Sequence, residues 1–197
     1  MAGTRAQESA AARRIQDAAT ACFAANGYAG TSTRQITARL GMSAAAMYPH
    51  FSSKEELLFA IALDGHRSVL AVMTAADDPG APFAARLDAV VAAFAQWQAR
   101  HHQLARVVQY ELGALTAAHR RTVTRLRRET TALLDAIVVG GVAAGEFGAD
   151  DPAEVVLAIS SLCVDVCRWF PSRTHRDPVT LGCAYARMAR RLAVVVS

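Results

Sequence analysis

Hydrophobic residues recur along most of the chain at the spacing of one face of an α-helix. In the first such segment, for example, Ile15, Cys22 and Phe23 share a face and alanines lie between them. We find no strand pattern of alternating polar and apolar residues, so the chain is predicted to be all-α, with about nine helices. The expected helices lie near residues 7–26, 32–40, 43–48, 53–76, 83–101, 104–113, 116–144, 152–170 and 178–197.

Residues that favour helix ends mark several of these boundaries. Ser32 is followed three residues later by Gln35, which is the pattern of a capping box. Asp151 and Asp177 each precede a proline, which places an N-cap directly before a proline at the first helical position. Gly41 is the residue type that ends a helix with positive φ and turns the chain sharply.

The stretch from Thr31 to Lys54 predicts two short helices joined by a tight turn at Gly41. This is the plan of a helix-turn-helix motif, in which the second helix enters the DNA major groove. Pro49 disfavours helical geometry at the residue before it and lacks an N–H, so we expect the second helix to end early.

Side chains in this stretch suit contacts with DNA. Hydroxyls and a cation at the start of the first helix suit a phosphate, and small residues on the second allow close approach to base edges. In an alternative interpretation the hydroxyls only cap helices and Tyr48 is an ordinary surface aromatic. The expected DNA-binding residues are Thr33, Arg34, Ser43, Ala44, Ala46, Tyr48, His50 and Lys54.

Residues 12–60 resemble the N-terminal DNA-binding domain of TetR-family transcriptional regulators (TetR/AcrR type). The resemblance implies an all-helical homodimer that binds a palindromic DNA operator and is usually released when a small molecule occupies the C-terminal body. It also implies a DNA-binding domain at residues 1–52 and a ligand-binding and dimerisation domain at residues 53–197. The matching motifs are Phe23…Gly27-Tyr28, Thr31-Ser32-Thr33, Leu40-Gly41-Met42-Ser43 and Tyr48-x-His50-Phe51-x-x-Lys54-Glu55.

Composition is consistent with a folded, DNA-binding protein. The chain has 197 residues, 53% of them hydrophobic, and a net charge of +4. The hydrophobic content argues against disorder, and the positive charge permits nucleic-acid binding without proving it. We see neither an apolar run of the roughly 20 residues that a membrane span needs nor a secretory signal. We therefore expect a cytoplasmic protein without a membrane partner.

The last two predicted helices carry long apolar strips. In the family such helices usually pair with those of a second chain, whereas the alternative interpretation is a core within one chain. All four cysteines are expected to be small buried apolar groups. The expected residues of the dimer interface are Ile159, Cys163, Val166, Leu181, Tyr185, Met188 and Leu192.

The helices between residues 53 and 170 are expected to enclose a small apolar effector. Glu111 occupies an apolar-spaced position, where a buried carboxylate would need a partner; a solvated glutamate is the alternative. The arginines between residues 120 and 128 form either a solvated face or the rim of an anion site. The expected ligand-binding residues are Met73, Phe94, Trp97, Val107, Tyr110, Glu111, Leu126 and Leu133.

The class of effector is less constrained by the sequence. Residues 109–112 and 166–169 weakly resemble regulators of lipid and sterol catabolism, whose effectors are often acyl-CoA thioesters. The alternative is a regulator of drug efflux that responds to planar or cationic drugs. We find no nucleophile with a base and no set of metal ligands, so we expect no catalytic residue, no cofactor and no metal. A plain helical interaction module is the remaining alternative.

Overall fold

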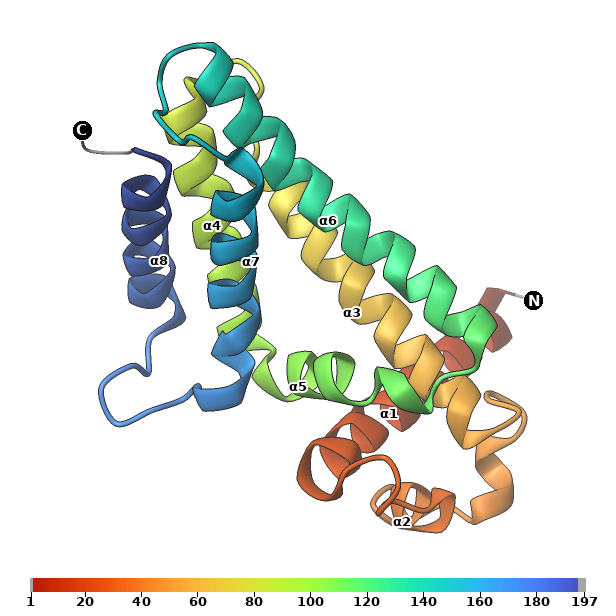
Figure 1. Cartoon of the computed structure of the whole chain (residues 1–197). Helices are drawn as coiled ribbons and strands as arrows, with labels where there is room; N and C mark the ends of the chain where they lie inside the picture. The colour runs from red at the N-terminus through yellow and green to blue at the C-terminus, as the bar shows by residue number, and fades with distance from the viewer. Residues whose placement is uncertain (1, 195–197) are drawn as a thin grey trace.

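The computed structural model describes residues 2–194, with side chains from residue 10 onward. It contains eight α-helices, two short 3₁₀-helices and no strand within that range, which confirms the all-α prediction (Figure 1). The elements are α1 (Ala2–Asn26), α2 (Thr33–Ala38), η1 (Ala44–Met47), α3 (Lys54–Ala76), α4 (Phe83–Arg100), α5 (His102–Tyr110), η2 (Leu112–Ala114), α6 (Ala117–Ala143), α7 (Pro152–Trp169) and α8 (Pro178–Ala193).

The predicted caps determine where several helices begin. Ser32 and Gln35 form the complete capping box, in which the Ser32 hydroxyl accepts from the Gln35 N–H and the Gln35 carboxamide accepts from the Ser32 N–H. The side chains of Asp151 and Asp177 accept hydrogen bonds from the first turns of α7 and α8. Gly41 adopts a φ of 67°, as its place after α2 predicts.

Two hydrophobic cores organise the helices. The smaller core lies among α1, α2, η1 and the first half of α3, and Val107 and Val123 join it from the larger body. The larger core lies among α3 to α8. In Figure 1, α3 and α6 run beside each other and connect the end that holds α1 and α2 to the end that holds α4, α7 and α8. Movement of α3 would therefore reach both cores.

The apolar character of α3 is stronger than the sequence analysis indicated. Among the described residues it is the one helix long and apolar enough to cross a membrane by length and composition alone. Its apolar residues pack into both cores, from Leu57 at its start to Met73 near its end. This is the pattern of a helix at the centre of a folded domain.

Helix α8 packs against α4 of the same chain. A Cβ added at Gly182 would lie 2.8 Å from the carbonyl oxygen of Ala92, so α8 approaches the α4 backbone closely there. Most of the predicted dimer-interface residues are buried within the single chain and offer little surface to a second, so the dimer interface stays a prediction. The buried ones are Ile159, Cys163, Val166, Leu181 and Tyr185, whereas Met188 and Leu192 are exposed. Cys183 is also exposed, unlike the other three cysteines.

Candidate nucleic-acid interface and effector cavity

The second element of the predicted helix-turn-helix motif is a 3₁₀-helix, not an α-helix. In η1 the N–H of Ala46 donates to Ser43 and that of Tyr48 to Ala45, which are three-residue steps. Pro49 has no N–H to give the carbonyl of Ala45, so the four-residue ladder of an α-helix cannot continue through it. The expectation of an early end is confirmed, but an α-helix over residues 43–48 was wrong.

The exposed face of η1 differs slightly from the predicted one. Ser43, Ala45 and Tyr48 are exposed, whereas Ala44 and Ala46 are half-buried. Ala45 was absent from the predicted set because that set followed the positions that the family resemblance implies. Of the remaining predicted residues, Arg34 is exposed while Thr33, His50 and Lys54 are half-buried. The fully buried Met47 fixes η1 to the smaller core.

Lys54 has an internal role that the sequence did not indicate. Its ammonium group donates to the carbonyl oxygens of Tyr28 and Thr31 at 2.8 and 2.7 Å, and lies 4.1 Å from the centre of the Tyr28 ring. These contacts tie the start of α3 to the turn between α1 and α2. An ammonium group has three N–H donors, so one remains for a phosphate.

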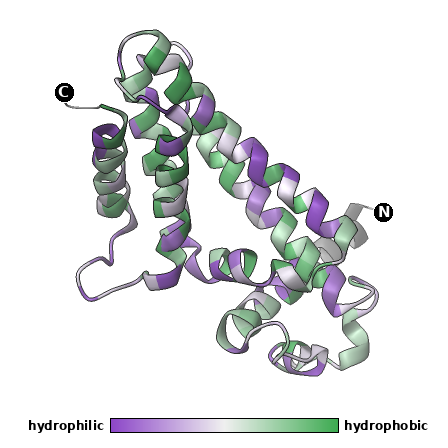
Figure 2. Cartoon of the chain, in the orientation of Figure 1, coloured by the Kyte–Doolittle hydropathy of each residue, from purple (hydrophilic) through white to green (hydrophobic). Residues whose placement is uncertain are grey.

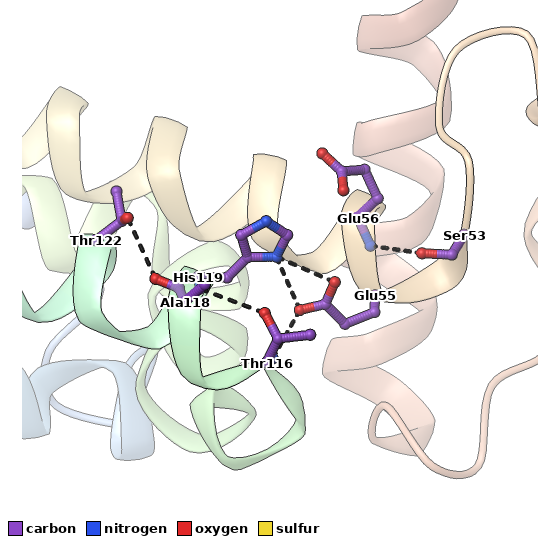
Figure 3. A network of polar contacts seen from close by, with 7 residues as sticks. All are labelled: Ser53, Glu55, Glu56, Thr116, Ala118, His119 and Thr122. Carbon is purple, nitrogen blue, oxygen red and sulfur yellow. Dashed lines mark hydrogen bonds and ion pairs between the residues drawn. The ribbon is translucent and has the colours of Figure 1, made fainter.

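A polar network joins the starts of α3 and α6 (Figure 3). The Glu55 carboxylate accepts hydrogen bonds from the Thr116 N–H at 2.8 Å and from Nδ1 of His119 at 2.9 Å. Burial disfavours ionisation of Glu55, but these hydrogen bonds outweigh it and hold the pKa of Glu55 below its usual value. The His119 ring stacks on Phe59 with ring centroids 3.7 Å apart. The network lies beside the smaller core, to which Leu57 and Leu115 belong.

A partly open cavity of about 120 Å³ lies in the larger body. Its wall is mostly apolar and comes from α3, α4, α5, α6 and α7. Phe94 and Trp97, two of the predicted ligand-binding residues, line it. The other apolar residues in its wall are Val69, Ala105, Val108 and Val164.

The remaining predicted ligand-binding residues do not line this cavity. Tyr110 is exposed and lines an adjoining groove of about 340 Å³ that shares Arg127 with the cavity. The carboxylate of Glu111 lies beside Gly27, because a Cβ built on Gly27 would be 3.5 Å from Oε1 of Glu111. The others belong to the cores: Met73, Val107 and Leu126 are buried, and Leu133 packs against the larger core.

Two polar residues of the cavity wall were missed from the sequence. His66 and Gln98 both line it, at positions with helical spacing from Val69 and Phe94. A polar residue at an apolar-spaced position was the available signal. Burial, with a further contribution from the Arg127 charge, lowers the pKa of His66 to about 4, so its ring is neutral at pH 7.

The arginines of α6 are exposed, and Figure 2 shows hydrophilic residues along this helix. One of them, Arg127, lines both the cavity and the groove. Arg125 lies 3.9 Å from Glu129 in a solvent-exposed pair. The run is therefore a solvated face with one member at the cavity.

Comparison with known proteins identifies the family. Residues 15–61 match the family model of bacterial regulatory proteins of the tetR family, and residues 80–193 match that of the tetracyclin repressor-like C-terminal domain. The chain belongs to the tetR family of bacterial regulatory proteins.

Individual relatives agree with this assignment. A crystal structure of a tetR-family regulatory protein from Rhodococcus RHA1 is 45% identical, covers 95% of this chain and 98% of its own, and has a TM-score of 0.91. AibR in complex with isovaleryl coenzyme A and operator DNA is 21% identical and shares the fold, with a TM-score of 0.82 over 90% of this chain and 97% of its own.

A curated relative matches over a shorter region. The HTH-type transcriptional repressor Rv1474c of Mycobacterium tuberculosis (strain ATCC 25618 / H37Rv) is 38% identical over 60 residues, which are 30% of this chain. The chain spans about a third of that relative's length, 32%.

Proposed function

We propose that this protein is a transcriptional repressor that binds a palindromic DNA operator as a homodimer. The observation that carries the proposal is the exposed face of η1, where Ser43, Ala45 and Tyr48 are exposed on a unit whose helices share one core. Small side chains let an element enter the major groove, and Tyr48 supplies a hydrogen-bonding group beside them. Arg34, exposed in the first turn of α2, supplies a cation for a phosphate.

The second chain of the dimer docks on the outer faces of α7 and α8. Apolar side chains there are exposed in the single chain, including Leu162 at 40% and Val179 at 49%. Met188 and Leu192 on α8 extend the same kind of surface. Burying such side chains against a second copy is favourable, and a two-fold dimer places two identical η1 elements on one operator.

A small apolar effector in the cavity releases the operator. The cavity wall is apolar, and Arg127 offers a positive charge to an anionic head group in the adjoining groove. An acyl-CoA thioester combines these two chemistries, and the AibR complex is an example of this fold holding one. Cationic drugs are the less favoured class, because no Asp or Glu lines the cavity and Asp165 in the groove is paired with Arg168 at 2.7 Å.

A DNA-binding assay tests the proposal. Selection of bound sequences from a random duplex pool should yield a palindrome, and the selected duplex should shift in a gel at nanomolar protein. Acyl-CoA thioesters of different chain length should then release it, whereas CoA alone should not. Selection without sequence enrichment would reject the repressor function, and release by cationic drugs alone would reject the acyl-CoA class.

A further inference from the structure

Two polar residues of the cavity wall, His66 and Gln98, contain buried atoms without hydrogen-bond partners. Nε2 of His66 and Oε1 of Gln98 are the two such side-chain atoms among the described residues, and both residues line the same cavity. Gln98 is only 6% exposed. A buried polar atom without a partner is costly, so two of them in one cavity indicate that something else supplies the missing bonds.

Other buried polar groups around the cavity are satisfied within the chain. The indole N–H of Trp97 donates to the Ser68 hydroxyl at 2.9 Å, and the Thr130 hydroxyl donates to the carbonyl of Leu126 at 3.2 Å. The two unpartnered atoms are therefore not a general property of this wall. The buried side-chain atoms of the wall that lack a hydrogen-bond partner belong to His66 and Gln98.

We propose that His66 and Gln98 are the polar anchors of the effector, and that they select a small apolar group carrying a neutral oxygen function, such as a hydroxyl. A hydroxyl can donate to Oε1 of Gln98 or accept from the imidazole N–H of the neutral His66. This inference rests on the proposed function only in taking the cavity as the effector site.

The size and charge of the cavity narrow the ligand further. A cavity of about 150 Å³ admits benzene, so a volume of about 120 Å³ suits a group of roughly that size or slightly smaller. The cavity wall contains no acidic side chain that could pair with a ligand's ammonium group, and the positive charge of Arg127 repels such a group. The buried end of the ligand is thus compact and uncharged, and any anionic part extends past Arg127 into the groove.

Matched probes test the anchors directly, in the absence of DNA. Phenol and toluene have nearly the same shape, and only phenol carries a hydroxyl; benzylammonium adds a positive charge. Titration calorimetry should show phenol binding about five- to tenfold more tightly than toluene, the equivalent of one net hydrogen bond, and no binding of benzylammonium.

Variants of the two anchors complete the test. Gln98→Met and His66→Phe preserve the approximate side-chain volume and should each reduce the phenol preference, because each removes one of the two anchors. Gln103→Met, at an exposed glutamine outside the cavity, should leave the preference unchanged. Gln98→Met should not lower the melting temperature, since it removes an unsatisfied polar atom.

Three outcomes would overturn the proposal: equal binding of phenol and toluene by the wild-type protein, an unchanged preference in both anchor variants, or no phenol binding up to its solubility limit. Because these measurements use the protein without DNA, their failure leaves the repressor function standing. Conversely, a failed operator selection leaves the anchors standing.

Discussion

The carboxylate of Glu55 lies 2.9 Å from Nδ1 of His119, and the two residues come from the first turns of α3 and α6. Glu55 directly follows the DNA-binding unit, whereas α6 continues from His119 to Arg127 at the cavity. Helix α3 also contributes His66 to the cavity. The pair therefore joins two helices that each connect the cavity to the region of η1.

Removing this link should weaken the fold. In Glu55→Ala the Thr116 N–H and the His119 ring lose their shared acceptor, so we expect the free energy of unfolding to fall by about 1–3 kcal/mol in urea titrations. Glu56→Ala is the matched control, because no hydrogen bond of its carboxylate to a described residue is found. Equal stability of the two variants would show that the link contributes nothing.

A charge on the exposed face of η1 should abolish operator binding. Ala45→Glu places bulk and negative charge where we propose that base edges and phosphates lie, while the residue's exposure leaves the core intact. Gel shifts should show no complex, and circular dichroism should show an unchanged helical signal. Normal operator binding by the folded variant would mean that η1 is not in the groove.

Lys54 should affect both stability and DNA binding. Lys54→Ala removes two hydrogen bonds to carbonyl oxygens, so the free energy of unfolding should fall by about 1–3 kcal/mol. If its third N–H contacts a phosphate, the slope of log K against log salt should decrease by about 0.9. An unchanged unfolding energy contradicts the internal role, and an unchanged slope contradicts the phosphate contact.

Substitutions on α7 and α8 should separate dimerisation from folding. Leu162→Arg introduces a charge on the exposed face and should yield a folded monomer by light scattering. Tyr185→Arg instead buries an unpaired charge within the chain, where Tyr185 is 8% exposed, and should unfold the protein. A dimeric Leu162→Arg variant would place the interface elsewhere, and so would a wild-type monomer at micromolar concentration.

The stability of the protein should fall as the pH decreases from about 6.5 to 4. His66 has a folded pKa of about 4, below its unfolded value of 6.5, so the unfolded chain takes up the proton first. The shifted pKa of His66 therefore adds as much as about 3 kcal/mol to the free energy of unfolding, and this stabilisation is fully present above pH 6.5. Urea titrations at pH 7 and 5 should show a smaller difference for His66→Phe than for the wild type. An equal difference would contradict the burial of a neutral ring.

Some features of this protein follow from the sequence alone. Capping residues such as Ser32, Asp151 and Asp177 act on backbone groups two or three residues away, so their effect is local and can be read directly. The same holds for Gly41 and for the missing N–H of Pro49. The resemblance to the family also came from a nearly continuous segment, because the helix-turn-helix unit is compact in sequence.

Other features depend on residues distant in sequence, and only the tertiary structure decided them. Periodicity placed Tyr185 on an apolar face but could not say whether that face meets α4 or a second chain; the close approach of Gly182 to Ala92 decided it. His66 and Gln98 lie on different helices, and only packing brings them to one cavity. The spacing of apolar residues in a sequence indicates which face of a helix is buried, whereas only the tertiary structure shows which helix or chain covers that face.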